Sequence, residues 1–596
     1  MRHVPALDGL RGLALLGVLF FHANGALPGG YLGVDLFFVL SGYLITSLLL
    51  AEQRETGRIA LSNFWVRRAR RLFPALLSLM PAVAIYARYF ARTEELQPLR
   101  AQALAALAYV ANWQTILAHR SYWQLFAAPS PLEHTWSLSI EEQFYVLWPL
   151  LVTYLLKRFS SRALLGVSLV LSALSMAAMF FLFTPENSTR AYLGTDTRMA
   201  GILLGAALAT LISPSQTFRA RTVRWLDGLG ALSLLGLGFA WYKLRGGNPF
   251  LYHGGFWLTE LGALVLIVCA VAGPQSYVAR VLALRPLTLL GTISYGVYLW
   301  HWPVNVCMTA QRVHVHGLAL YALRFAVTFA IAIASYWCLE RPIRRNGVPF
   351  NRPLLVVPAA ILLSVFLVVH ATYAGEGRAS SAPSTFAQVS AFPEEDVRYR
   401  VLLFGDSTAN SLGWGLRSLH EEGVGIELLG KDGCNMLTTS ACEAAHWGEQ
   451  VRKLHPNVSL VYLAGAFLYG FSVQGSWHTA CRPDWNAQFK TALSKGLTDL
   501  RREPGDVYVS TIPYPLGPYE DEPEMHERAV CINTLIRKVA GAVPGVRLLD
   551  VGNHLCPNGV CQQDIGLKEP IRPDGVHFDI ESAHDVSRWV YEQLRR

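Results

Sequence analysis

Repeated apolar runs, each close to the minimum length for crossing a bilayer, dominate the first 374 of the 596 residues. A helix needs about 20 such residues to span the hydrocarbon core. A chain that carries many of these runs does not fold as an ordinary water-soluble protein. Its 52% hydrophobic residues also exclude a disordered chain. We therefore expect a polytopic α-helical membrane domain.

About eleven membrane spans are predicted, with the stretch 101–118 left in an external loop. Loop charge decides this arrangement. With 101–118 outside, the predicted cytoplasmic loops hold 18 Lys and Arg in 65 residues and the opposite loops hold 7 in 85, as the positive-inside rule requires. The N-terminus is then cytoplasmic and residues after about 372 lie outside. The expected spans are 5–26, 33–51, 72–91, 138–157, 163–183, 194–212, 226–243, 256–273, 287–308, 319–339 and 354–371.

The charge balance changes sign along the chain. Residues 1–374 hold 30 Lys and Arg against 14 Asp and Glu, whereas residues 375–596 hold 21 against 28. We expect a membrane domain over 1–345, an additional transmembrane helix and linker over 346–384, and a soluble domain over 385–596. The acidic second part gives no electrostatic reason to bind nucleic acid.

Ionisable residues inside spans are costly to bury, so each is a candidate functional residue. Arg11 and His22 are eleven residues apart and share one face of a helix, separated by about 16 Å along its axis. An imidazole is well suited to accept a proton near neutral pH. The alternative is that neighbouring helices satisfy both residues and that neither has a chemical role. Asp8 and Arg11 also interrupt the first apolar run, so we expect that run to be retained and not cleaved as a signal.

Two further charged clusters lie at the ends of predicted spans. Arg67, Arg68, Arg70 and Arg71 either anchor the chain at the cytoplasmic surface or bind phosphate groups, which guanidinium groups contact through paired hydrogen bonds. Glu141 and Glu142 begin another span, and since neighbouring residues on a helix point about 100° apart, we expect at most one to face a central cavity. A carboxylate that favours the helix dipole is the alternative. Asp35, Asp196 and Arg198 are further polar residues at or within spans.

Over nearly all of residues 5–345 the sequence resembles the acyltransferase-3 family of integral membrane acyltransferases. The resemblance implies that Arg11 and the four clustered arginines help bind acyl-CoA. It also implies that His22 and a glutamate of the Glu141–Glu142 pair act at the acyl-transfer site. The stretches that carry it are LDGLRGLALLGVLFFH, GYLGVDLFFVLSGYLIT, FWVRRARRLFPAL, HTWSLSIEEQFYVLWP, TDTRMAGILLGAALA, SYGVYLWHWP and ERPIRR.

The second part alternates strand-like and helix-like segments. Strands are predicted near 401–404, 459–464, 507–511 and 546–551, and helices near 408–422, 485–502, 524–541 and 580–594. Such alternation indicates a parallel sheet with helices on both faces, that is, a three-layer α/β domain.

Six of the nine cysteines lie in this second part. An even number in an extracytoplasmic domain favours disulfides, and the predicted pairs are Cys434 with Cys442, Cys556 with Cys561, and Cys481 with Cys531. Zinc binding is the alternative, but no Cys-x-x-Cys spacing is present. No metal site is expected.

A possible catalytic serine follows the first predicted strand, in Gly405-Asp406-Ser407. A serine in a strand-to-helix turn exposes its hydroxyl next to backbone amides that stabilise an oxyanion. The common alternative is a simple helix cap. His577 and Asp574 lie just before the last predicted helix. There His577 is placed to act as a base and Asp574 as the acid that orients it.

This arrangement looks like the SGNH hydrolase superfamily, whose fold is flavodoxin-like, over about residues 398–596. The resemblance implies that Ser407 is the nucleophile, His577 the base, Asp574 its partner and Gly433 an oxyanion donor. The Gly-x-Asn-Asp block of that superfamily is absent, since the chain reads Leu-Ala-Gly-Ala-Phe over 463–467.

Together the two resemblances imply an O-acyltransferase. It would move an acyl group, expected to be acetyl, from cytoplasmic acyl-CoA to a hydroxyl of an extracytoplasmic polysaccharide. Acetyl-CoA would be the donor substrate, and no permanently bound cofactor is expected. The expected acceptor is lipopolysaccharide O-antigen, with peptidoglycan or another exopolysaccharide as the alternative. A transporter joined to an SGNH esterase is a rival. The expected location is a bacterial inner membrane, with the SGNH domain in the periplasm or outside the cell.

Overall fold

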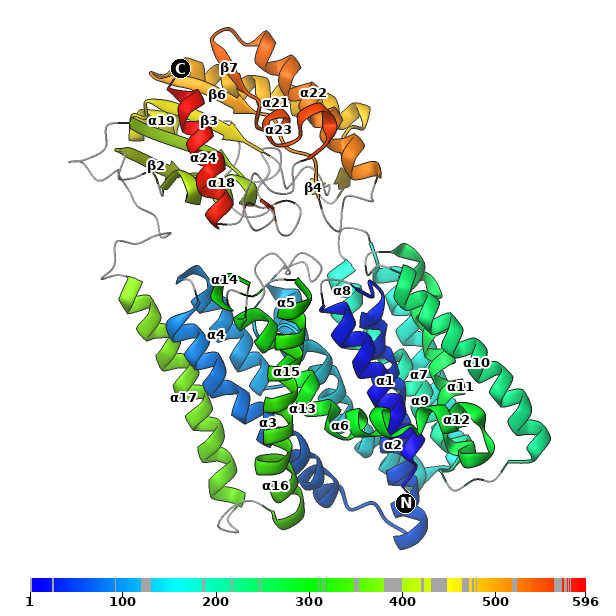
Figure 1. The fold of residues 1–596 in the computed structure, drawn as a ribbon. Coiled ribbons are helices and arrows are strands. Elements are labelled where there is room, and N and C mark those ends of the chain that lie inside the picture. The colour runs from blue at the N-terminus through cyan, green and yellow to red at the C-terminus, as the bar shows by residue number, and fades with distance from the viewer. Residues whose placement is uncertain are drawn as a thin grey trace. The chain divides into compact units, whose positions relative to one another are not determined.

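The fold is taken from a computed structural model and divides into two compact units, residues 1–385 and 386–596 (Figure 1). Each unit has its own buried apolar core and is described by itself. The structure describes the whole chain except residues 1–2, 24–25, 92, 119–129, 185–187, 215, 217, 245, 247, 309, 314, 316, 348–352, 380–398, 418, 420–422, 430–446, 464–470, 474–475, 479, 517–522, 562–570, 573–575, 577, 579 and 596.

The first unit is helical, and each predicted span overlaps a helix of the described residues. Seven of its helical segments, among the described residues, are long and apolar enough to cross a membrane. The count of eleven spans therefore stays a prediction. The helices are α1 (Pro5–Phe21), α2 (Gly33–Thr56), α3 (Leu61–Tyr89), α4 (Thr93–Leu107), α5 (Ala111–Leu117), α6 (Thr135–Arg158), α7 (Ser161–Leu182), α8 (Ser188–Leu193), α9 (Thr195–Leu211), α10 (Ala220–Lys243), α11 (Phe256–Ala272), α12 (Tyr277–Leu282), α13 (Arg285–Cys307), α14 (Ala310–Val313), α15 (Gly317–Ser335), α16 (Arg341–Asn346) and α17 (Pro353–Ala379).

The stretch 101–118, which loop charge placed outside the membrane, is not one continuous helix. It is divided between α4 and α5, and the break contains Tyr109 with a backbone φ of 54°. That left-handed conformation is costly for a residue with a side chain and ends a helix. Neither helix alone has the length of a membrane span.

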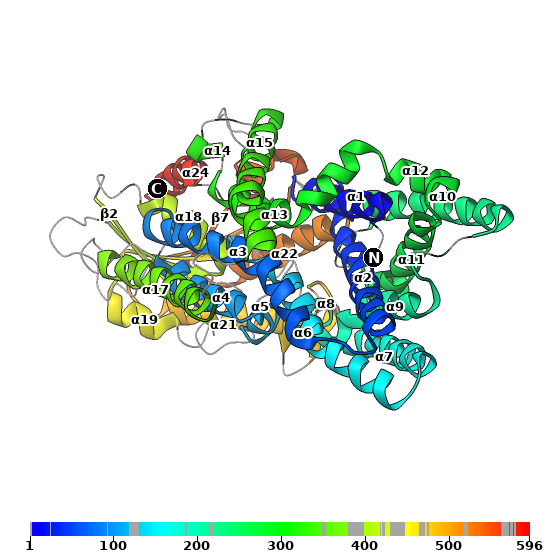
Figure 2. The ribbon, with the colours of Figure 1, turned by 90° about the horizontal axis from the view of Figure 1, so that it is seen from below.

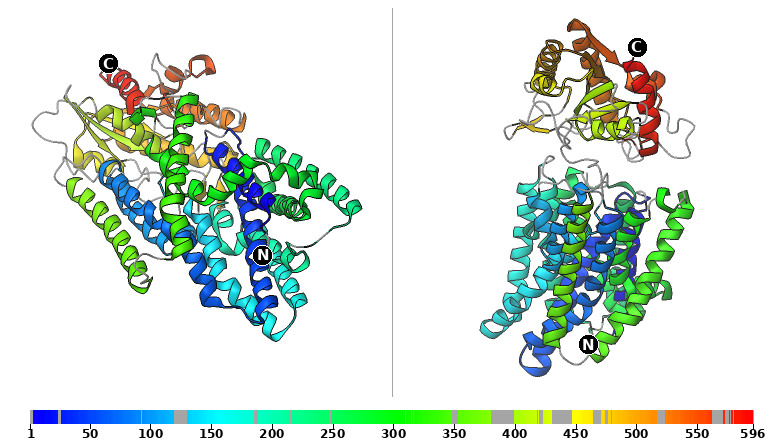
Figure 3. Two further views of the ribbon diagram at one scale, coloured as in Figure 1. Left: turned by 60° about the horizontal axis from the view of Figure 1, so that its bottom comes forward. Right: turned by 90° about the vertical axis from the view of Figure 1, so that its left-hand side faces the viewer.

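Small residues allow the helices of this unit to approach one another closely. Between α2 and α9, a Cβ at Gly42 would lie 1.8 Å from the carbonyl oxygen of Ile202, and a Cβ at Gly205 would lie 2.0 Å from that of Val39. Such contacts are typical of helix packing in membranes. Helices α3, α4 and α17 gather on one side of the bundle and α7, α9, α10 and α11 on the other (Figures 2 and 3).

The second unit is the predicted α/β domain. Its five-stranded sheet is parallel, in the order β2-β1-β3-β6-β7, and β4 pairs with β5 as a short antiparallel hairpin. The strands are β1 (Tyr399–Gly405), β2 (Val424–Leu428), β3 (Val458–Tyr462), β4 (Phe471–Val473), β5 (Ser476–His478), β6 (Asp506–Ser510) and β7 (Val546–Leu549). The helices are α18 (Ser407–Arg417), α19 (Trp447–Leu454), α21 (Pro483–Arg501), α22 (Pro523–Ala542), α23 (Val551–Leu555) and α24 (Ile580–Leu594).

The order of the strands fixes where a site can form. From β1 the chain passes through α18 to β2 on one side, and β3 lies on the other side of β1. The carboxyl ends of the two strands that flank such a reversal form the usual binding crevice of parallel sheets. Helices α18 and α24 pack together, and α21 packs against α19 and α22 (Figure 1). The carboxyl end of β1 leads directly into Ser407.

Candidate active sites

A cavity of about 350 Å³ opens inside the helical unit, a volume typical of small-molecule sites. Helices α1, α2, α3, α6 and α13 all contribute to its wall, together with Tyr109. Its charged and polar lining residues are His3, Asp8, Arg11, Ser41, Arg68, Arg71, Tyr109, Ser137, Glu141, Glu142, Tyr145, Ser294, Tyr295 and Tyr298. The fold thus brings together Arg11, part of the arginine cluster and both glutamates, which sequence reasoning had named separately.

Arg11 is held in place by Asp8, one turn earlier on α1. Its guanidinium donates to Asp8 Oδ1 over 3.1 Å, and His3 Nε2 lies 2.6 Å from the other oxygen of the same carboxylate. Asp8 thereby fixes one side of the Arg11 guanidinium and leaves a cationic group on the cavity wall.

Only two of the four clustered arginines line the cavity. Arg68 and Arg71 are three residues apart on α3 and lie on its cavity face. Arg67 is exposed and forms an ion pair with Glu52 at 3.3 Å. Arg70 is half-buried and is not among the residues of the wall. The arginine cluster therefore has a cavity side and a surface side.

Glu141 and Glu142 both contribute to the cavity wall; whether only one of them faces the cavity squarely stays a prediction. The cavity extends around more than one side of α6, whose Ser137, Leu138 and Tyr145 also line it. Tyr145 donates to Glu141 Oε2 over 2.9 Å, and its ring lies 5.6 Å from the Arg68 guanidinium carbon. Tyr145 thus contacts both Glu141 and Arg68.

His22 follows the last residue of α1 and does not line the cavity. Its Nδ1 lies 2.9 Å from the Val18 carbonyl oxygen and 3.2 Å from Nε2 of His301 on α13. Sequence reasoning named His22 but missed His301 and the nearby His134. Both stand in the stretches that carry the family resemblance, and a polar residue beside or within an apolar run was the signal that could have found them.

A buried ion pair lies between α2 and α9. Arg198 Nη2 is 2.7 Å from Asp35 Oδ1, and both side chains are fully buried. The Arg198 guanidinium carbon also lies 4.4 Å from the Phe256 ring centre and 4.9 Å from that of Tyr192. Asp196, by contrast, pairs with Arg190 in a part-exposed bidentate contact. The sequence singled out Asp35, Asp196 and Arg198 but did not show that Asp35 pairs with Arg198 or Asp196 with Arg190.

In the α/β domain the proposed catalytic residues are only partly described. Ser407 is the first residue of α18, as a strand-to-helix turn requires, but its side chain lies outside the described residues. So do Asp574, His577, Gly433, Cys434 and Cys442, and most of the segment that lacks the Gly-x-Asn-Asp block. The neighbours of His577 are informative, since the Phe578 N–H donates to Ser411 Oγ on α18 over 3.3 Å.

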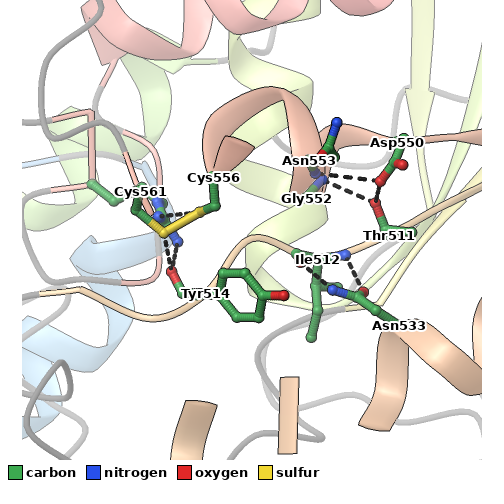
Figure 4. Close-up of a disulfide and its surroundings, with 10 residues drawn as sticks. Thr511, Ile512, Tyr514, Asn533, Asp550, Gly552, Asn553, Cys556 and Cys561 are labelled. Atoms are coloured by element: carbon green, nitrogen blue, oxygen red, sulfur yellow. Dashed lines mark hydrogen bonds between the residues drawn. A yellow bond between two sulfur atoms is a disulfide. The ribbon is translucent and has the colours of Figure 1, made fainter. Parts of the chain in front are cut away.

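The segment that follows β6 is fixed from several sides (Figure 4). Asn533 makes two 2.8 Å hydrogen bonds to the backbone of Ile512, and Thr511 Oγ1 donates to Asp550 over 2.6 Å (Figure 4). Burial raises the pKa of Asp550, but hydrogen bonds from Arg537 and Thr511 outweigh it, so the pKa lies below the ordinary 3.8.

Two of the three predicted disulfides are formed among the described residues, and the third pair, Cys434 with Cys442, lies outside them. Cys481 bonds to Cys531. Cys556 bonds to Cys561, and Figure 4 shows this second disulfide. Buried Arg572, two residues before Asp574, donates to the Tyr514 carbonyl over 2.7 Å and contacts Cys556 Sγ. The Cys556–Cys561 bond therefore supports the chain just before the Asp574 segment. Among the described residues no group of three or more His, Cys, Asp or Glu is arranged to hold a metal ion.

Comparison with known proteins matches each of the two units to a protein family. Residues 4–338 match an acyltransferase domain family, and residues 377–583 match an SGNH domain that occurs fused to such domains. The O-acetyltransferase OatA of Staphylococcus aureus is 37% identical over 386 residues, which cover 61% of this chain and 63% of that protein. The peptidoglycan O-acetyltransferase OatA of Listeria monocytogenes is 39% identical over 357 residues, which cover 58% of this chain and 56% of that protein.

The match thus spans less than two thirds of the length of these curated relatives. Among solved structures, a GDSL-like lipase from Bacteroides thetaiotaomicron is 12% identical, with a TM-score of 0.26, over 37% of this chain and 96% of that one. Since the acyltransferase match covers more than half of the sequence and is followed by the SGNH match, the chain belongs to the acyltransferase-3 family of membrane proteins, in the group that carries a fused SGNH domain.

Proposed function

We propose that this chain is an O-acetyltransferase that moves acetyl groups from cytoplasmic acetyl-CoA to hydroxyl groups of peptidoglycan. The observation that carries the proposal is the cavity in which Arg11, Arg68 and Arg71 meet Glu141 and Glu142. The membrane domain takes the donor on the cytoplasmic side, and the SGNH domain works on the outer side of the cytoplasmic membrane.

The arginines of the cavity suit the donor. Coenzyme A carries several phosphate groups, and guanidinium groups bind phosphate through paired, charge-assisted hydrogen bonds. Arg68 and Arg71 come from one helix face and Arg11 from another helix, so phosphates in this cavity are contacted from two directions. Arg67 and Arg70 are not among the residues of the cavity wall, and the exposed Arg67 serves as a cytoplasmic surface charge.

The acyl-transfer step is assigned to His22, while the two glutamates, which the family resemblance also implicates, line the cavity at the arginines. His22 lies eleven residues beyond Arg11, about 16 Å further along the helix direction. A donor held by its phosphates at the arginines directs its thioester end away from them, toward His22. Imidazole then takes the proton of the accepting hydroxyl as its oxygen attacks the thioester carbonyl, and returns it to the departing thiolate.

Ser407 carries the final transfer. Its hydroxyl attacks the acetyl ester formed in the membrane step, and His577, oriented by Asp574, takes the serine proton and gives it to the first acceptor's oxygen as that group leaves. The glycan hydroxyl then attacks the serine ester, and the serine leaves with its hydroxyl restored. The Phe578–Ser411 hydrogen bond supports this assignment. It ties the residue after His577 to a position one helical turn beyond Ser407.

The preferred acceptor changes from the one expected on the sequence. We expected lipopolysaccharide O-antigen, with peptidoglycan as an alternative. The relative from Listeria monocytogenes is named a peptidoglycan O-acetyltransferase, and this favours peptidoglycan as the acceptor of this chain.

The test compares cells that lack the native protein and express the wild type, His22→Ala or Ser407→Ala. Mass spectrometry of purified peptidoglycan and of the other surface polysaccharides measures the added acetyl groups. We expect acetylated peptidoglycan with the wild type and none with either variant. Acetylation confined to another polysaccharide would overturn the acceptor, and a loss of acetyl groups on wild-type expression would support an esterase instead. A reporter fused after residue 380 tests the orientation and is expected outside.

A further inference from the structure

Three histidines from separate helices gather at the end of α1. His22 caps α1, His134 immediately precedes α6, and His301 lies within α13. The His301 ring centre is 5.0 Å from that of His22 and 5.5 Å from that of His134, so His301 occupies the middle of the cluster. His301 is only 1% exposed. None of these rings lines the arginine cavity.

The contacts of His301 determine which of its nitrogens carries the hydrogen. Its Nδ1 lies 2.5 Å from the Tyr298 carbonyl oxygen. A carbonyl oxygen only accepts hydrogen bonds, so Nδ1 is the donor and the neutral ring has its lone pair on Nε2. That Nε2 is the atom that lies 3.2 Å from His22 Nδ1.

The same reasoning fixes the tautomer of His22. Its Nδ1 lies 2.9 Å from the Val18 carbonyl oxygen, so Nδ1 carries the hydrogen and shares it between that oxygen and His301 Nε2. The lone pair of neutral His22 is then on Nε2. A base that takes a proton at Nε2 requires this tautomer, and a wrong tautomer inactivates such a base.

We infer that His301 is a positioning residue for His22, a role that rests on the proposed function. Tyr298 holds the His301 ring so that Nε2 accepts from His22. When His22 Nε2 takes the hydroxyl proton, the hydrogen bond from its Nδ1 to His301 becomes charge-assisted and strengthens. The O–H bond of the acceptor breaks, its oxygen bonds to the thioester carbonyl carbon, the C–S bond breaks, and His22 returns the proton to the thiolate. His301 keeps its own Nδ1 hydrogen throughout.

Two amide substitutions of similar chemistry separate positioning from packing. In His301→Gln the longer side chain places an amide oxygen near the former Nε2, where it can accept from His22. In His301→Asn the shorter side chain reaches the former Nδ1 position near the Tyr298 carbonyl but not His22. The Asn variant loses only one methylene more of buried volume than the Gln variant. The effect of this loss on folding is measured as the thermal midpoint of unfolding of the full chain.

The experiment uses the full-length protein in proteoliposomes with radiolabelled acetyl-CoA and a soluble peptidoglycan fragment as acceptor. We expect kcat to fall at least ten-fold in His301→Asn, with the KM for acetyl-CoA changed less than three-fold, and His301→Gln to recover most of that loss. Provided that the wild type is active, two outcomes would overturn the inference. One is equal activity of the Asn and Gln variants, and the other is a fall in the thermal midpoint of unfolding of the Asn variant that accounts for its loss of activity. An inactive wild type would instead overturn the proposed function, and this role of His301 with it.

Discussion

The Phe578 backbone N–H and the Ser411 hydroxyl are joined by a 3.3 Å hydrogen bond across the α/β domain. Both residues are buried, and Ser411 also donates to the Thr408 carbonyl over 2.8 Å, within the first turn of α18. One serine therefore connects the helix that starts at Ser407 with the chain that follows His577.

Ser411→Ala is expected to slow Ser407-dependent acetyl transfer. The substitution leaves a buried N–H without its acceptor, which costs about 1–3 kcal/mol. If poorer alignment of His577 raises the activation free energy by about 1 kcal/mol, the rate falls roughly five-fold. The measurement is acetyl transfer from a chromogenic ester by the full-length protein. Ser587→Ala is the matched control, because Ser587 is equally buried and donates to Leu412 of the same helix over 2.9 Å. Equal rates in the two variants would show that the tether has no catalytic role.

The arginine cluster is expected to divide into two functional halves. Arg68→Ala and Arg71→Ala each remove a cavity cation and should raise the KM for acetyl-CoA about ten-fold, since charge-assisted bonds contribute about 1.5–3 kcal/mol. Arg67→Ala removes an exposed cation from the same helix and should change KM less than two-fold. Initial rates over a range of acetyl-CoA concentrations give the comparison. A larger effect at Arg67 than at Arg68 would contradict phosphate binding in the cavity.

Arg198→Met is expected to destabilise the membrane domain strongly. It leaves Asp35 buried without its cation, and breaking a buried pair from one side costs about 3–5 kcal/mol. Asp35→Asn combined with Arg198→Met removes both charges and should recover part of the loss. Thermal unfolding of the detergent-solubilised chain measures the effect. Asp196→Asn, which disrupts only a part-exposed pair with Arg190, is the control and should shift the midpoint little. No difference between Arg198→Met and this control would exclude a structural role for the buried pair.

The sequence predicted the elements well because their signals are local. Hydropathy marks each membrane helix within its own length, and the alternation after residue 400 predicted β1, β3, β6 and β7 together with α18, α21, α22 and α24. Strand β2, the β4–β5 hairpin and the short helices α19 and α23 were missed. The hairpin strands have three residues each, which carry little periodic signal.

The candidate sites were harder to predict because their partners are distant in the sequence. Helical spacing separates Arg68 and Arg71 from Arg67 and Arg70, but it does not say which pair faces inward. His22 meets His301, 279 residues later, and Asp35 meets Arg198 through the packing of α2 on α9. Such contacts follow from the tertiary fold, which no single-helix pattern specifies.

Acid is expected to loosen the segment around Asp550 in the α/β domain. Since hydrogen bonds from Arg537 and Thr511 lower the pKa of Asp550 below 3.8, the folded state holds the ionised carboxylate more favourably than the unfolded state does. Its stabilisation is therefore fully present above about pH 4 and is lost as the pH falls through the lowered pKa.

Hydrogen exchange of the Gly552 and Asn553 amides in the full chain measures this loss directly, because these amides donate to Thr511 Oγ1 and to the Asp550 carboxylate. Their protection factors should fall below pH 4 in the wild type. In Asp550→Asn they should be lower at neutral pH and change less with acid. Asp506→Asn removes a half-exposed carboxylate 3.5 Å from Arg547 and should keep the wild-type profile. If Asp550→Asn retained the wild-type acid dependence, another group would have to account for it.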